Sequence, residues 1–180
     1  MRKIGYILFA VVLSIFMLEL KGQNTATSVR LDIVLNPILN LTVHPDQQNT
    51  TLEYLTLEDY RNGVEVTSPK QLSVFSTGPY VLNVRLADAL YSKVSGEVEK
   101  EMYLPDVRIS AIPVNGGNMR LESQSVTTAE KSLVYDDQPA FHKTFDLNYK
   151  GPGGNALVDF VNKSAQSTFT NTVLYSIEVR

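Results

Sequence analysis

Short runs in which apolar residues recur at every second position constrain the fold of this chain more than any other feature. Alternation with a period of two places the apolar side chains on one face of a β-strand. Turn-forming residues such as Asn36-Pro37 and Thr77-Gly78-Pro79 separate the runs, and no long helical pattern lies between them. The clearest runs occupy residues 28–35, 39–43, 71–76, 80–87, 104–113, 132–135, 141–149 and 169–179. The pattern predicts an all-β fold.

The number and spacing of these runs predict an antiparallel, immunoglobulin-like β-sandwich of about seven to nine strands. A closed barrel is the alternative architecture. The strongest hairpin pattern joins Gln71 to Ser76 with Tyr80 to Ala87 through Thr77-Gly78-Pro79.

Four shorter segments also give local predictions. Thr51 to Leu55 is a short candidate strand, and Ser68-Pro69 favours a turn. Leu57 to Asn62, followed by Gly63, predicts one helical turn or a tight loop. Ser92 to Glu101 is charged and predicts a loop.

The first 22 residues, Met1–Gly22, have the pattern of a secretory signal peptide. Arg2 and Lys3 precede an apolar run from Ile4 to Leu18, and Gly22 offers a small residue at a cleavage position. An uncleaved anchor or a spanning helix is the alternative, but a span requires about 20 predominantly apolar residues, and this run is shorter. We therefore expect export to the periplasm, the cell surface or the medium, with no membrane anchor after cleavage.

Composition narrows what the mature chain can do. Residues 23–180 are enough for a single domain with a core of its own. The whole chain has a net charge of −3, and the signal carries three basic residues and one acidic one, so the mature chain carries −5. That charge argues against a nucleic-acid partner. Because the chain has no cysteine, disulfides, thiol nucleophiles, cysteine metal sites and a lipidated cysteine are excluded.

No catalytic or metal-binding motif stands out in the mature chain. His44 and His142 have no partner at ligand spacing, so we expect neither to bind a metal. Asp136-Asp137 could supply oxygen ligands to calcium, but a solvated polar turn is the favoured interpretation. Gly151-Pro152-Gly153-Gly154 lacks the lysine of a phosphate loop and is interpreted as a hinge-like turn. We predict a non-enzymatic protein without a cofactor.

Two features could support binding. Tyr54 and Tyr60 lie in and beside the predicted helical turn, where exposed rings could stack on sugars. In the early run Ser28 to Leu35, the residues Val29, Leu31, Ile33 and Leu35 share one face, and this strand could pair with the sheet edge of a neighbouring subunit. Pairing within its own domain is the alternative that we favour for this strand.

Several segments resemble small exported bacterial surface domains, namely coat-protein-U-like, fimbrial-subunit-like and WxL-type domains. The segments are Tyr60–Val64, Leu72–Tyr80 and Thr168–Tyr175. The resemblance implies an immunoglobulin-like sandwich with a structural or adhesive role at the cell envelope. The chain has no tryptophan and no cysteine, so the Trp-x-Leu motifs and the fimbrial disulfide are missing, and no functional residue is transferred.

Together these observations predict an exported, non-enzymatic surface or fimbria-like protein that works through strand edges and loops. Its expected partners are protein subunits or surface glycans. A secreted carbohydrate-binding module is the alternative function.

Overall fold

The computed structural model describes residues 26–96, 100–162 and 165–180. The signal peptide predicted at Met1–Gly22 lies outside these residues. The chain divides into two units, Met1–Leu35 and Asn36–Arg180, and each is described by itself. Within the described residues, no helix has the length and apolar character that a membrane crossing needs.

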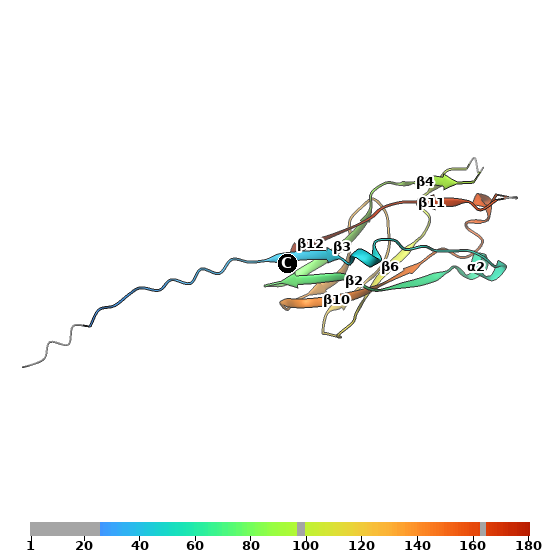
Figure 1. Ribbon diagram of the computed structural model, residues 1–180. Coiled ribbons are helices and arrows are strands. Elements are labelled where there is room, and N and C mark those ends of the chain that lie inside the picture. Colours follow the sequence, from blue (N-terminus) through green and yellow to red (C-terminus); the bar gives the residue numbers. More distant parts are fainter. Residues whose placement is uncertain (1–25, 97–99, 163–164) are drawn as a thin grey trace, which may run out of the picture. The chain divides into compact units, whose positions relative to one another are not determined.

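The second unit is all-β and its strands pair antiparallel in three sheets (Figure 1). The first sheet has the order β1 (Leu39–Val43), β2 (Glu65–Ser76), β10 (Ala140–Lys150), β6 (Arg108–Pro113) and β8 (Ser123–Ser125). The second has the order β12 (Val173–Val179), β3 (Tyr80–Leu86), β9 (Lys131–Asp136) and β7 (Arg120–Leu121). The third, smaller sheet has the order β11 (Thr168–Thr170), β4 (Leu90–Ser95) and β5 (Met102–Tyr103). The helical segments are η1 (Pro45–Gln47), α2 (Leu57–Asn62) and η2 (Val158–Phe160).

Apolar side chains from the two larger sheets form one hydrophobic core. Leu72 of β2 and Phe145 of β10 come from the first sheet, and Leu82 of β3 and Leu133 of β9 come from the second. All four are fully buried. Removing such a side chain typically costs about 2 to 5 kcal/mol, so this shared core is the main stabilising feature of the unit.

The hairpin predicted between the 71–76 and 80–87 runs is wrong. Both runs form strands, but β2 pairs with β1 and β10, whereas β3 pairs with β12 and β9. Thr77 to Pro79 therefore carries the chain from one sheet to the other. Each strand already has a partner along both edges, so neither has an edge left for the other.

The turn predicted at Ser68-Pro69 is also wrong, because β2 continues through it as a single strand. Lys70 adopts a positive φ of 49°, and its amide donates to the Asp146 carboxylate at 2.7 Å. The register of β2 against β10 shifts between Phe145 and Leu147. Residues 69–71 of β2 thus lie opposite the single residue Asp146 of β10, and this β-bulge accommodates the proline without ending the strand.

The helical turn at Leu57–Asn62 is confirmed as α2. Thr56 caps it by accepting from the Asp59 amide, and the Asp59 carboxylate accepts from the Thr56 amide at 2.7 Å. Gly63 follows with φ of 82°. Accepting these amide hydrogen bonds, chiefly from Thr56 and then from Leu55, lowers the pKa of the Asp59 carboxyl.

Three other expectations differ from the structure. Thr51 to Leu55 forms no strand, and β4 extends through Ser95 into the segment predicted to be a loop. The described residues form 12 strands, more than the number predicted. Strands such as β5 and β7 have only two residues, which is too few to show an alternating pattern.

Candidate functional site

The segment Ser28–Leu35, here called the apolar segment, lies in the first unit and is exposed along its length. Its five large apolar side chains, Val29, Leu31, Ile33, Val34 and Leu35, are between 76% and 93% exposed. The strand expected here is not formed, since no residue in the described part of the chain pairs with it. A strand is stable only in a sheet, and this segment has the side-chain pattern of a strand but no sheet partner.

The edge of β12 that faces away from β3, here called the free edge of β12, presents backbone groups that pair with no strand among the described residues. The Thr172 carbonyl accepts from the Ala87 amide at 2.8 Å, and the Arg180 amide donates to the Pro79 carbonyl at 3.2 Å. Backbone groups alternate in direction along an antiparallel strand. The even-numbered residues of β12 therefore direct their N–H and C=O groups toward β3. The odd-numbered residues direct theirs outward: Val173, Tyr175, Ile177 and Val179.

β1 presents a similar but shorter edge. The His44 amide donates to the Gln71 carbonyl at 2.8 Å, and the Ile38 carbonyl accepts from the Thr77 amide at 3.0 Å. Leu39, Leu41 and Val43 consequently direct their backbone groups away from β2. β1 and β12 lie next to each other, yet no backbone hydrogen bond joins them among the residues described.

Side chains along these two edges cover the core only in part. Leu39 and Leu41 of β1, and Val173, Tyr175 and Ile177 of β12, all pack on the core while remaining half-buried. The hydroxyls of Tyr175 and Tyr149 are hydrogen-bonded to each other at 2.7 Å, and burial raises the pKa of both. The inward face of this side of the fold is therefore apolar and incompletely covered.

The structure brings the two predicted sugar-stacking residues together but uses them to pack loops. The Tyr54 and Tyr60 rings are 5.3 Å apart, tilted at 43°, and half-buried. The Tyr54 hydroxyl donates to the Pro152 carbonyl at 2.9 Å, and burial raises its pKa to about 12. Each side chain is thus only partly accessible, and sugar binding by these residues stays a prediction.

The glycine-rich segment 151–154 packs tightly against the residues that follow α2. A Cβ added to Gly153 would lie 2.7 Å from the Arg61 carbonyl oxygen, and one added to Gly63 would lie 2.4 Å from the Gly151 carbonyl oxygen. The amides of Gly154 and Asn155 donate to the carbonyls of Arg61 and Tyr60 at 2.8 Å. These glycines allow two backbones to approach closely, which is a packing role that a hinge does not require.

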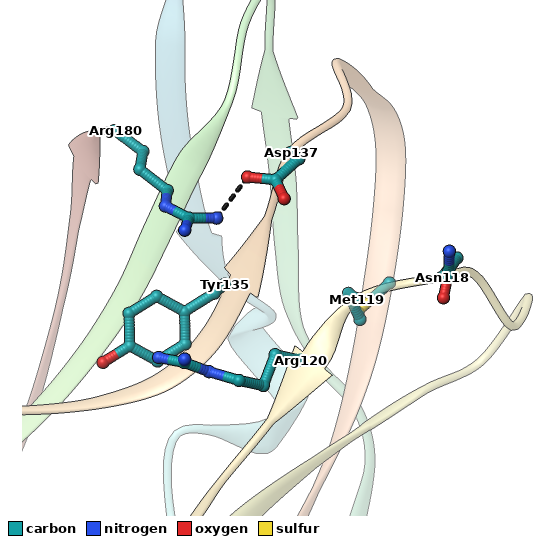
Figure 2. A pocket seen from close by; sticks show the side chains of 6 residues that line it. All are labelled: Asn118, Met119, Arg120, Tyr135, Asp137 and Arg180. Carbon is teal, nitrogen blue, oxygen red and sulfur yellow. Dashed lines mark hydrogen bonds and ion pairs between the residues drawn. The ribbon is translucent and has the colours of Figure 1, made fainter.

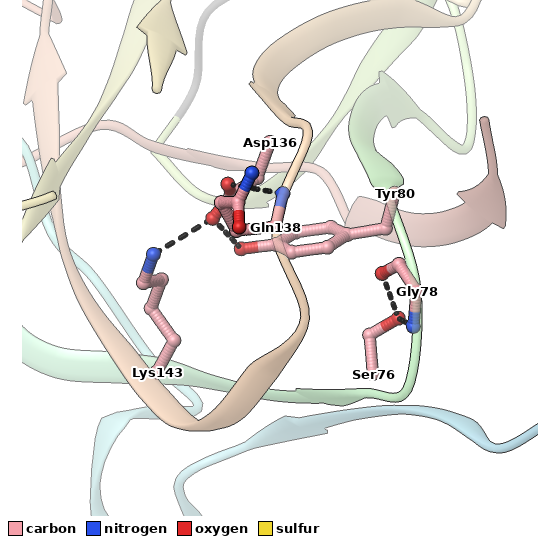
Figure 3. A network of polar contacts seen from close by, with 6 residues as sticks. All are labelled: Ser76, Gly78, Tyr80, Asp136, Gln138 and Lys143. Carbon is pink, nitrogen blue, oxygen red and sulfur yellow. Dashed lines mark hydrogen bonds and ion pairs between the residues drawn. The ribbon is translucent and has the colours of Figure 1, made fainter. Parts of the chain in front are cut away.

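The aspartates predicted to form a solvated turn have two different environments. Asp136 is 1% exposed and accepts from the Lys143 ammonium at 2.7 Å (Figure 3). Asp137 is exposed and paired with Arg180. The Tyr80 hydroxyl and the Gln138 amide also donate to Asp136, at 3.3 and 3.1 Å. The solvated turn is thus wrong for Asp136, because Lys143 supplies the charge that allows its burial.

One open hollow of about 400 Å³ lies beside β7 and β9 (Figure 2). The Arg120 guanidinium lies 3.7 Å from the centre of the Tyr135 ring, as in a cation–π contact. Arg120 is also paired with Glu122 at 3.4 Å, and Arg180 is paired with Asp137. Both positive charges are already balanced by neighbouring carboxylates, so the hollow carries no free charge that would select a ligand.

The two histidines lie apart in the fold. His44 precedes η1, with its Nδ1 4.0 Å from an Asp46 carboxylate oxygen, and His142 packs edge-on against Phe75. Among the residues described, no group of three or more histidine and acidic side chains could hold a metal ion.

Comparison with known proteins adds no family. No protein-family model matches the chain, and no curated protein matches it. The features that bear on function are therefore the apolar segment and the two sheet edges. Sequence reasoning found the segment and the parity of 173–179, but missed that β12 is an edge strand, because alternation does not say which strands are neighbours.

Proposed function

We propose that this protein is an exported, non-enzymatic structural or adhesion subunit of the cell surface, with an immunoglobulin-like sandwich fold, that assembles with other protein subunits through strand edges. The observation that carries the proposal is the exposure of the apolar segment. Five large apolar residues in seven positions are in contact with solvent in the isolated chain.

The energetics favour burial of this segment in an assembly. Burying one large aliphatic side chain contributes about 1.5 to 3 kcal/mol. Strand addition would also satisfy the segment's backbone groups through main-chain hydrogen bonds, while alternate side chains enter an apolar site. The free edges of β1 and β12 offer both the hydrogen-bonding groups and the apolar surface that this mode requires.

Export is the second part of the proposal and comes from the sequence of Met1–Gly22. The mature chain has a net charge of −5 and no cysteine. After export it would therefore fold by burial and backbone pairing, without disulfides. The periplasm, the cell surface and the medium are all compatible with it.

A carbohydrate-binding module is the less favoured function. The Tyr54 hydroxyl already bonds to Pro152, and a Cβ on Gly151 would lie 2.2 Å from that hydroxyl. The ring is therefore held in a packed contact between loops, whereas a sugar platform needs an open aromatic face.

The proposal is tested by the oligomeric state of the chain from Gln23 in variants of the apolar segment. We expect the unaltered chain to self-associate at micromolar concentration in light scattering coupled to size exclusion. Leu31→Asn should weaken association at least tenfold, because its side chain shares the face of Val29 and Ile33. Val34→Asn is the matched control, since Val34 is equally exposed but lies on the opposite face. A monomeric unaltered chain, or equal effects of the two substitutions, would contradict the proposal.

A further inference from the structure

We propose that the apolar segment of one molecule binds the free edge of β12 in a second copy of this chain, with the two strands antiparallel. This inference rests on the proposed function and adds the acceptor strand, the direction and the register. It identifies the partner as another copy of the same protein.

The lengths of the sheet edges favour β12 as the acceptor. The apolar segment has eight residues and β12 has seven, whereas β1 has five, β8 three and β7 two. β12 offers four outward-directed backbone positions, and β1 offers three. Among the sheet edges in the described residues, only β12 can pair with nearly the whole segment, so it gives the largest number of main-chain hydrogen bonds.

The side chains of β12 favour the same assignment. Val173, Tyr175 and Ile177 face the core and are half-buried, and Val179 on the same face is 70% exposed. A strand added beside β12 displaces β1 from this edge, because neighbouring strands lie about 4.8 Å apart and β1 now lies next to β12. Its own inward side chains then lie next to these four. The apolar segment has four apolar residues at the matching spacing of two: Val29, Leu31, Ile33 and Leu35.

One antiparallel register matches both faces of the two strands. It places Val29 opposite Val179 and Leu35 opposite Val173, so that all four apolar pairs face the core. On the outer face it places Arg30 opposite Glu178 and Val34 opposite Leu174. Opposite charges and apolar pairs across strands are each favourable by a few tenths of a kcal/mol to about 1 kcal/mol.

Other registers fit less well. Shifting the antiparallel pairing by two residues in one direction places Asp32 opposite Glu178, which brings like charges together. A shift in the other direction places Asp32 opposite Leu174. A parallel arrangement with Arg30 beside Glu178 leaves Ile33 and Leu35 beyond Val179, without partners on β12.

Engineered cysteines test this register, because the chain has no cysteine of its own. In the proposed pairing, Asp32 lies opposite Ser176 at a position without ladder hydrogen bonds. Such pairs have Cα atoms about 4.5 Å apart, which a disulfide can span. Asp32→Cys and Ser176→Cys are placed in separate proteins, so that a disulfide between these two sites can only join two molecules.

The two single-cysteine proteins are mixed under mild oxidation, and the products are followed on non-reducing gels and by peptide mass spectrometry. We expect the 32–176 disulfide to form at least tenfold faster than disulfides from Asp32→Cys to Leu174→Cys or Glu178→Cys. Arg30→Cys with Glu178→Cys is a second pair at the same register and should also cross-link rapidly. Thermal melts of each variant show whether the fold is kept.

The other outcomes separate failure of this inference from failure of the proposed function. Fastest cross-linking of Asp32→Cys to Thr42→Cys would identify β1 as the acceptor and overturn the inference. Fastest cross-linking to Leu174→Cys or Glu178→Cys would overturn the register. An associated sample with no 32–176 disulfide would refute β12 while leaving assembly intact, and a monomeric sample would refute both. In a protein carrying both Asp32→Cys and Ser176→Cys, a disulfide within one monomer would show that the segment folds onto its own chain, which also overturns the inference.

Discussion

Replacing Lys143 by methionine should strongly destabilise the fold, although Lys143 itself is partly exposed. Lys143 is 20% exposed at its side chain, whereas its partner Asp136 is 1% exposed (Figure 3). Methionine keeps much of the packing volume but leaves the buried carboxylate without a counter-charge. Breaking a buried pair from one side typically costs about 3 to 5 kcal/mol. Because Tyr80 and Gln138 still donate to Asp136, we expect about 3 kcal/mol.

A double-mutant cycle measured by urea unfolding at pH 7 separates this effect from lost packing. Asp136→Asn removes the charge but keeps an acceptor, and Lys143 can then reach solvent, so we expect a cost of about 1 kcal/mol. The cost of the double variant should be about 2 kcal/mol smaller than the sum of the two single-variant costs, and this difference is the coupling energy. Lys150→Met, an exposed position on the same strand, is the matched control and should cost under about 0.5 kcal/mol. A Lys143→Met cost no larger than that of Lys150→Met would refute the reasoning.

Three further predictions concern packing, pH dependence and helix capping. Gly153→Ala should destabilise the protein by about 1 to 3 kcal/mol in urea unfolding, because the added Cβ would collide with the Arg61 carbonyl. A Cβ added at Gly78 meets nothing within 4 Å, so Gly78→Ala should cost less than a third of that. Burial, and next the charge of Asp136, raises the pKa of the Tyr80 hydroxyl above its ordinary value of 10.0. The free energy of unfolding should therefore be retained below pH 10 and fall as the pH rises further. Alkaline unfolding followed at 295 nm checks this, and Tyr80→Phe should make the fall less steep. Thr56→Ala should lower stability by about 0.5 to 2 kcal/mol in thermal unfolding, with Thr56→Ser restoring most of it, and equal melting of all three proteins would count against the cap.

The sequence predicted the class of fold because alternation is a local property. The runs at 39–43 and 132–135 lie within β1 and β9, and Gly63 ends the helical turn expected at Leu57–Asn62. Each of these features depends on neighbours within a few residues. A single sequence contains that information directly.

The sequence did not predict which strands are neighbours. The 71–76 and 80–87 runs have the pattern of a hairpin, yet Tyr80, Val81 and Leu82 are all buried, which marks β3 as a strand covered on both faces. Whether a tight connection joins two strands of one sheet or crosses between sheets depends on partners far away in the chain, here β12 and β9. The burial of Asp136 also escaped prediction, because its partner Lys143 is only seven residues away in the chain but lies on a different sheet.

The candidate site was half predictable. The parity of Val29, Leu31, Ile33 and Leu35 is visible in the sequence, and so is the parity of the 173–179 run. Their exposure and the edge position of β12 come only from the structure. A strand pattern that the sequence assigns to the protein's own sheet is thus found without a sheet partner among the described residues.

β1 lies next to the free edge of β12, but β12 itself carries none of the usual sequence features that block strand addition. Natural edge strands commonly carry proline, an inward-pointing charge or a bulge that blocks strand addition. β12 contains no proline, its inward residues are all apolar, and its register with β3 is regular over seven residues. Selection against edge-to-edge association is expected to remove such a strand from a monomer. A sheet edge without these blocking features and an exposed apolar segment of matching length are each liabilities alone, and strand addition between copies would remove both.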